Sequence, residues 1–229
     1  MKEEQFSLDE TRLSVDLSDA TQAVKESRFE DALSLLKVLL KENPNHIDIL
    51  YLSAVSTRFL KQFDDSQKHI EHLLFNAPDM GRAYQELGHL NRDMGNEEKA
   101  VMHYRQACEL NPALPSSWNY LHKYFEKIQN VPAAEHALEQ IRKLESLPGL
   151  LLFIEQILNE GRLGLAETKC RAFLKENPTH TYAMSLLAEI ANRFGYFDDA
   201  EFLLQKAVEF QPKDGDLRLK YASILRKKQ

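Results

Sequence analysis

Two histidines one helical turn apart are the first residues of this sequence that could do chemistry. His69 and His72 stand at i and i+3, a spacing that can bring two imidazoles to one face of a helix and so to one metal ion. No third or fourth ligand follows at a readable spacing, and Glu71 stands between them in HIEH instead of the HExxH order of zinc proteases. We therefore favour a solvent-exposed helix face and expect no metal.

Arrangements for catalysis are equally hard to find. Gly161 and Gly164 form no glycine-rich phosphate loop, and no serine stands in a nucleophile elbow. Cys108 and Cys170 are too few for a disulfide framework, and we interpret them as small core thiols in a reducing compartment. The sequence therefore predicts no catalytic residue and no cofactor in these 229 residues.

The elements that would position any site come from an internal repeat. The stretch from Gly81 to Pro112 is the clearest copy, and it contains Tyr84-x2-Leu87-Gly88, Gly95, Ala100-x3-Tyr104, Ala107 and Pro112. Prolines that can end a helix recur along the chain at Pro44, Pro78, Pro112, Pro178 and Pro212. The steps are 34 residues in three cases (78 − 44, 112 − 78 and 212 − 178). Twelve residues before each proline stands a small residue, namely Ala32, Ser66, Ala100, Ala166 and Ala200.

This order of residues resembles the tetratricopeptide repeat, in which two amphipathic helices and two short turns fill a period of about 34 residues. The resemblance implies an all-α fold, a right-handed α-solenoid of helix hairpins with six full repeats plus a terminal helix from about Gly215. Gly88 and Ala100 would lie where the two helices of one hairpin come closest, and Gly95 would turn the chain between them. One hairpin cannot bury both its faces, so each repeat requires neighbours.

The repeat pattern is interrupted in the middle of the chain. Between Pro112 and Pro178 lie 66 residues, two short of two periods. In repeats 4 and 5 the slot of Gly88 holds the bulky His122 and Ile154, so we expect their hairpins to be splayed. The heptapeptide at 40–46 recurs with one change at 174–180, which indicates a second array that begins with repeat 5. Convergence on a good helix-ending sequence is the alternative explanation.

We accordingly predict three segments. Residues 1–10 form a frayed N-terminus, residues 11–146 form a sub-array of repeats 1 to 4, and residues 147–229 form a sub-array of repeats 5 and 6 plus the terminal helix.

The resemblance also implies where a partner would bind. The first helix of each repeat would line the inner face of the solenoid, mainly through its second, fifth, ninth and twelfth positions. In repeats 2 to 4 these positions contain four basic and two acidic residues, in a chain of net charge −6. They favour an extended peptide with carboxylates, held by charge-assisted hydrogen bonds. The expected peptide-binding residues are Tyr51, Arg58, Arg82, Gln85, His89, Arg92, Asn119 and Lys123. Ordinary solvated side chains are the alternative interpretation.

Composition restricts the partners further. The 29 basic and 35 acidic residues argue against binding of bulk nucleic acid, which needs a basic surface. The N-terminal decapeptide has neither the basic nor the apolar region of a secretion signal. The longest apolar run, from Leu150 to Ile154, is too short to cross a bilayer. We therefore expect a cytoplasmic protein with a protein or peptide partner, no nucleic acid and no membrane, and the sequence does not indicate its oligomeric state.

Several stretches of the second half carry a narrower likeness. They are NEGRL at 159–163, CRAFL at 170–174, LLAEI at 186–190, DDAEFLL at 198–204 and YASILRKKQ at 221–229. They resemble the amino-terminal repeat region of bacterial tetratricopeptide-repeat sulfotransferases. The resemblance implies a catalytic domain that uses the sulfate donor PAPS and would follow Gln229, since no donor-binding loop occurs in these residues. The alternative is a free-standing adaptor for a partner with an acidic extended segment, and a reading frame that continues past Gln229 would separate the two.

Overall fold

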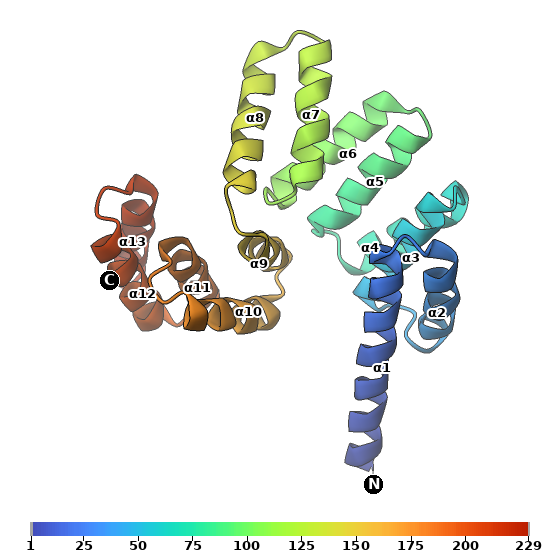
Figure 1. The fold of residues 1–229 in the computed structure, drawn as a ribbon, viewed down its shortest axis with the longest axis horizontal. Coiled ribbons are helices and arrows are strands. Elements are labelled where there is room, and N and C mark those ends of the chain that lie inside the picture. The colour runs from blue at the N-terminus through green and yellow to red at the C-terminus, as the bar shows by residue number, and fades with distance from the viewer. Residues whose placement is uncertain (1, 229) are drawn as a thin grey trace. The chain divides into compact units, whose positions relative to one another are not determined.

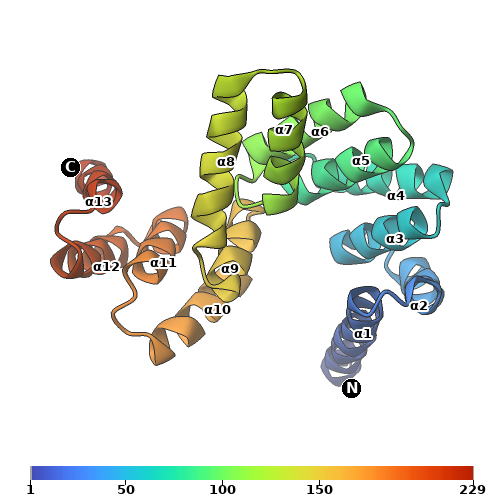
Figure 2. The same ribbon diagram turned by 45° about the horizontal axis from the view of Figure 1, so that its top comes forward.

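A computed structural model describes the backbone of residues 2–228 and the side chains of residues 12–228. The described chain consists of thirteen helices without a strand, arranged as six hairpins and a last single helix, which confirms the predicted fold class and helix number (Figure 1, Figure 2). The helices are α1 (Lys2–Lys25), α2 (Phe29–Glu42), α3 (Ile47–Phe59), α4 (Phe63–Asn76), α5 (Gly81–Asp93), α6 (Glu97–Leu110), α7 (Pro115–Lys127), α8 (Val131–Glu145), α9 (Gly149–Asn159), α10 (Leu163–Glu176), α11 (Thr181–Arg193), α12 (Phe197–Phe210) and α13 (Gly215–Lys227).

The chain divides into two compact units, residues 1–138 and residues 139–229. Unit 1 contains α1 to α7 and the first half of α8, and unit 2 contains the rest of α8 and α9 to α13. The division falls inside α8, whereas the sequence places the boundary after Ser146. The first half of α8 belongs with α7, because Ala134 is buried in one apolar cluster with Leu121 and Phe125. At the other end, α1 begins at Lys2, and the fraying that the sequence predicts for residues 1–10 stays a prediction.

Each hairpin turns at a residue with left-handed backbone geometry. Three of these residues are glycines, and their φ angles are 80° at Gly95, 75° at Gly161 and 82° at Gly195. The other three turns use Ser27, Lys61 and Gln129, with φ between 56° and 60°. A left-handed residue just past a helix lets the chain satisfy the last carbonyl groups while it reverses direction, and glycine adopts this conformation at the least cost. The predicted role of Gly95 as a hairpin turn is confirmed.

The closest approach of two helices in a hairpin is occupied by the small residues that the repeat predicts. Ala32, Ala100, Ala166 and Ala200 are all fully buried. Ser66, which replaces alanine in the second repeat, is also fully buried and donates its hydroxyl to the carbonyl oxygen of Ala54 at 3.0 Å. Across the α5–α6 contact, a Cβ atom added to Gly88 would lie 2.7 Å from the ring of Tyr104. No side chain fits there, so the predicted register of this hairpin is confirmed.

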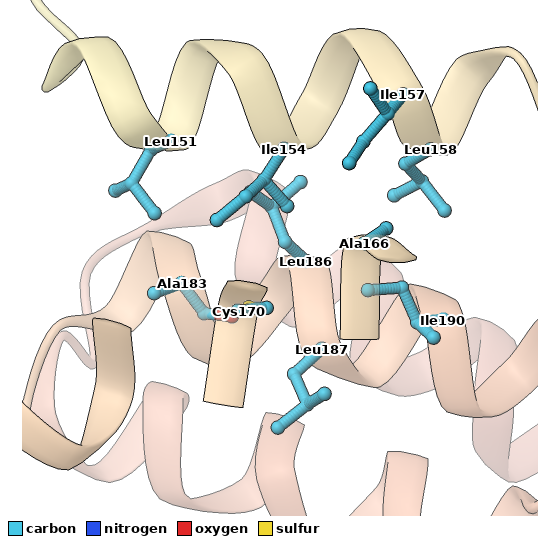
Figure 3. Close-up of a cluster of buried hydrophobic side chains, with 10 residues drawn as sticks. All are labelled: Leu151, Ile154, Ile157, Leu158, Ala166, Cys170, Ala183, Leu186, Leu187 and Ile190. Atoms are coloured by element: carbon cyan, nitrogen blue, oxygen red, sulfur yellow. The ribbon is translucent and has the colours of Figure 1, made fainter. Parts of the chain in front are cut away.

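The fifth repeat, α9 and α10, accommodates its bulky residue in a buried cluster. Figure 3 shows this cluster, in which α9 presents Leu151, Ile154, Ile157 and Leu158 to α10 and α11. Ile154 is fully buried in the slot that Gly88 holds in α5, and Cys170 stands where Tyr104 stands in α6. The small thiol leaves the space that the isoleucine takes. The expected splaying of the hairpins in repeats 4 and 5 stays a prediction.

Candidate functional site

The first helices of repeats 2, 3 and 4 are neighbours in unit 1, so their side chains meet across helix boundaries. The guanidinium carbon of Arg82 on α5 lies 4.9 Å from the ring centre of Tyr51 on α3. On the other side of α5, the amide Nε2 of Gln85 donates to the Ser117 hydroxyl of α7 at 3.0 Å. We call this surface the first-helix face. It consists of the eight residues predicted to bind a peptide together with Glu86, Asp93 and Tyr120 of the same helices, and Tyr104 of α6 packs beneath it.

Arg58 is the main departure from the sequence prediction. Its side chain is only 6% exposed, and its Nε donates to Glu86 Oε1 at 2.5 Å while Nη1 donates to Asp93 Oδ2 at 2.7 Å. Glu86 itself is 2% exposed. The guanidinium also lies over the ring of Phe59, 4.3 Å from its centre. Arg58 is therefore a buried cation held by two carboxylates of the next repeat, and it cannot serve as the exposed cation that we expected.

The pKa values in this ion-pair network reflect the competition between burial and charge. Burial lowers the pKa of Arg58, but Glu86 and Asp93 outweigh this effect and hold that pKa above its ordinary value. Burial likewise raises the pKa of Glu86, opposed by the charge and hydrogen bond of Arg58. The network connects α3 to α5 with charge-assisted hydrogen bonds, which are stronger than neutral ones.

His89 is held as a neutral hydrogen-bonding group. Burial, and then the nearby cations Arg58 and Arg92, lower the pKa of His89 to about 3. Its Nδ1 lies 2.6 Å from the hydroxyl oxygen of Tyr104, whose own pKa is raised by burial. The ring of Tyr104 packs against that of Tyr120 on α7, with 4.4 Å between the ring centres. At neutral pH the imidazole therefore offers hydrogen bonds rather than a positive charge.

The remaining predicted residues lie nearer the surface. Lys123 and Arg92 are exposed, and Arg92 Nη2 is 2.8 Å from Asp93 Oδ1. Asn119 is partly buried, and its Nδ2 donates to the carbonyl oxygen of Pro115 at 3.0 Å. Arg82 is partly buried beside the ring of Tyr51, so the fully exposed cations of the first-helix face are Arg92 and Lys123.

Sequence reasoning missed the two acidic partners of Arg58, although a signal was present. Glu86 and Asp93 stand 28 and 35 residues after Arg58, on either side of one repeat period. Residues about one period apart lie on equivalent, neighbouring helices. A basic residue followed at that distance by acidic residues is therefore a sequence signature of an ion pair between repeats.

The histidine pair and Cys170 lie away from this face, whereas Cys108 is hydrogen-bonded to Ser117, the partner of Gln85. Cys108 and Cys170 are free, buried thiols, which confirms their interpretation as core residues. Burial raises the pKa of Cys108 to about 12 and that of Cys170 to about 11. The Nε2 of His72 lies 2.9 Å from Asn45 Oδ1, in a contact between α4 and the turn before α3. Across the described residues, none of the helices has the length and apolar character needed to cross a membrane.

Comparison with known families decides what the hairpins are. Residues 81–114 match the family described as Tetratricopeptide repeat. They form a tetratricopeptide repeat. The other described hairpins have the same two-helix architecture and a buried small residue at the same position, so the fold is an α-solenoid of hairpins of this kind.

A solved structure shows the same fold at a TM-score above 0.5. The pilF protein of Pseudomonas aeruginosa is 15% identical over 95% of this chain and 98% of its own, with a TM-score of 0.52. The tetratricopeptide repeat protein TTC0263 of Thermus thermophilus is 23% identical over 93% of this chain and 98% of its own, with a TM-score of 0.45. No curated protein matches the chain.

Proposed function

We propose that this chain is a protein-interaction module and that its first-helix face binds an extended peptide that carries carboxylates. The observation that carries the proposal is the continuity of the face across α3, α5 and α7, through the contacts Tyr51–Arg82 and Gln85–Ser117. An extended peptide that crosses these three neighbouring helices would meet cations and an amide on α5, and a cation and an amide on α7. Tyr51 adds a rigid aromatic surface at low entropic cost.

The buried ion pairs support this proposal indirectly. Arg58, Glu86 and Asp93 fix α3 against α5, and Tyr104 with His89 and Tyr120 fixes the hairpin against α7. A surface that is already ordered loses less conformational entropy when a ligand binds. The exposed groups then act as the recognition elements: Arg92 offers a planar fork suited to a carboxylate, and Lys123 offers a point charge.

The test is a pair of charge-reversal variants with a defined probe. The probe is a fluorescein-labelled extended peptide with glutamate at alternate positions, measured by fluorescence anisotropy with the whole chain. We expect the double variant Arg82→Glu, Arg92→Glu to weaken binding at least about tenfold, while helicity by circular dichroism is unchanged. Binding to the unaltered chain should fall steeply with added salt, because exposed charges are screened beyond about 8–10 Å.

A matched control has the same charge change on the other face of the same hairpin. Lys99 and Arg105 lie on α6, the second helix, and both are exposed. The variant Lys99→Glu, Arg105→Glu should bind the acidic peptide as the unaltered chain does. If both double variants lost affinity equally, net charge rather than the first-helix face would explain binding, and the proposal would be wrong.

The narrower assignments stay predictions. A sulfotransferase repeat region and a free-standing adaptor both agree with an array of tetratricopeptide repeats, and so does a cytoplasmic location. The reading frame of the gene separates the first two: continuation past Gln229 into a phosphosulfate-binding loop supports the sulfotransferase, and a stop codon there supports the adaptor. The proposed peptide-binding role is compatible with either result.

A further inference from the structure

Unit 2 contains an apolar cleft that the first-helix face does not include. The cleft lies among α10, α11 and α12 and has a volume of about 220 Å³. Its floor is formed by Leu187, Ile190 and Ala191 of α11, which are at most 8% exposed, and by Leu203 of α12. In Figure 3 the side chain of Leu187 points away from α9. An apolar cavity of about 150 Å³ suffices for a benzene ring, so the cleft has room for one large apolar side chain.

Exposed aromatic rings surround the cleft. Phe202 of α12 and Tyr196 before it are each 60% exposed, and Phe194 at the end of α11 is 39% exposed. The rings of Phe194 and Tyr196 lie 5.8 Å apart between centres. Large apolar side chains gathered around an open apolar cleft mark a place where a partner docks.

The fold does not require the two most exposed rings. The other five second helices have polar or flexible residues at the position of Phe202, namely Ser34, Lys68, Met102, His136 and Thr168. The position before each second helix, which Tyr196 holds in the sixth repeat, is polar in the other five, with Arg28, Gln62, Asn96, Asn130 and Arg162. Hairpins of the same architecture therefore form without an aromatic at either place. Packing within the repeat does not account for Tyr196 and Phe202.

Charge at the rim identifies the kind of partner. On α10, Glu167 and Arg171 neutralise each other through a bond of 2.9 Å. On α12, Asp198 and Glu201 are both paired with Lys228. Asp199 has no ion-pair partner among the described residues and lines the cleft. The lining thus has one uncompensated negative charge beside an apolar, aromatic-rimmed space.

We propose that this cleft docks an amphipathic segment of a partner protein, which inserts one bulky apolar side chain beside Phe202 and Tyr196 and pairs a neighbouring lysine or arginine with Asp199. An amphipathic helix supplies both groups, because residues three or four apart share a face. The preference is opposite to that of the first-helix face, which attracts carboxylates. The two surfaces would therefore hold different segments.

The experiment uses the whole chain and two designed peptides. The first is a fluorescein-labelled 14-residue amphipathic helix with leucines along one face and lysines beside them, and the second has glutamate in place of each lysine. We expect the lysine peptide to bind more tightly than the glutamate peptide. Phe202→Thr, which installs the residue type of the fifth repeat, should weaken binding of the lysine peptide at least about tenfold, as removal of a central aromatic anchor does. Asp199→Asn should abolish the preference between the peptides.

The control is another exposed aromatic on the same helix. Phe210 is 50% exposed at the end of α12 and does not line the cleft. Phe210→Thr should leave affinity unchanged. Equal losses for Phe202→Thr and Phe210→Thr would show unspecific adhesion and overturn the proposal. Unchanged binding by Phe202→Thr would overturn it as well.

Self-association is the remaining alternative, and sedimentation velocity measures it. If the unaltered chain formed a dimer that Phe202→Thr abolished, the occupant of the cleft would be a second copy of this chain, and a foreign amphipathic segment would be the wrong assignment. A chain that sediments as a monomer while it binds the lysine peptide supports the proposal.

Discussion

Gly88 and Tyr104 in the hairpin α5–α6 correspond to Ile154 and Cys170 in the hairpin α9–α10. In the hairpin α5–α6 of unit 1, the second helix supplies the large side chain of Tyr104 and the first helix has a glycine opposite it. In the hairpin α9–α10 of unit 2, the first helix supplies the large side chain of Ile154 and the second helix has the small Cys170. All three side chains and Gly88 itself are buried. Protein interiors are close-packed, so a contact can keep its combined volume while its residues are exchanged. What recurs from repeat to repeat is thus the filled space between two helices.

The surroundings of the two hairpins differ in polarity. In unit 1, the first helix α5 contributes the buried Glu86 to an ion pair with Arg58. In unit 2, the first helix α9 buries Leu151, Ile157 and Leu158 in an apolar cluster. A buried ion pair adds little net stability, but it penalises arrangements that leave one charge without the other. The polar interior of unit 1 therefore specifies the register of α3 against α5 more strictly than apolar packing would.

The largest expected effect concerns this ion pair. Arg58→Met removes one partner and leaves the carboxylate of Glu86 buried, which should cost about 3–5 kcal/mol of unfolding free energy. The double variant Arg58→Met, Glu86→Leu should recover much of that loss. Urea unfolding followed by circular dichroism measures both.

Unit 2 supplies the comparison for that prediction. Lys206 of α12 pairs with Glu209 on the same helix at 2.7 Å, and the two side chains are 43% and 49% exposed. Lys206→Met should cost less than about 1 kcal/mol, as expected for a surface pair. Similar costs for Arg58→Met and Lys206→Met would contradict the special role of the buried network.

A smaller effect is expected when the exchange between the hairpins is copied. Gly88→Ile places a side chain against the ring of Tyr104, where even a Cβ atom would be 2.7 Å away, and should cost about 2–3 kcal/mol. Adding Tyr104→Cys reproduces the pair found in the fifth repeat. The loss of unfolding free energy in the double variant should therefore be smaller than the sum of the losses in the two single variants. A double-mutant cycle measures this difference as a favourable coupling energy. Simple additivity would show that volume is not exchanged across this contact.

The smallest expected effect is a dependence of unit 1 on pH through His89. The pKa of His89 is about 3 in the folded chain and 6.5 in its unperturbed state. Between these values the unfolded chain binds a proton that the folded chain does not, so stability is present above pH 6.5 and is lost as the pH falls through this window. Between pH 6.5 and about pH 5.5, the range that the experiment covers, the loss should be about 1 kcal/mol.

His89→Gln removes this titration and retains a group that can hydrogen-bond to Tyr104. The free energy of unfolding of the variant, relative to the unaltered chain, should therefore improve as the pH falls from about 7 to about 5.5. Arg58, Arg92, Asp93 and Tyr104 face the imidazole and remain in both chains. Parallel pH profiles for the two chains would contradict the buried, neutral state of His89.

Much of this fold could be predicted from the sequence because its rules are local. Proline ends a helix by removing a donor, glycine turns the chain at positive φ, and a small residue that recurs about every 34 residues marks a close contact between helices. From these rules the sequence predicts thirteen helices, a hairpin turn at Gly95 and a buried Ala100, and the structure confirms all three. They also gave the positions of the first-helix face, since a helical period places every third or fourth residue on one side.

The tertiary structure alone decided what those side chains do. A basic residue at a first-helix position is compatible with solvent or with a buried partner, and the choice depends on which residues the next repeat brings within hydrogen-bonding distance. Glu86 and Asp93 bury the charge of Arg58, whereas Lys123 stays exposed. The cleft beside Phe202 likewise exists only because α10, α11 and α12 leave space between them. Local rules act along one segment, but burial is a property of several segments together, and only their packing determines it.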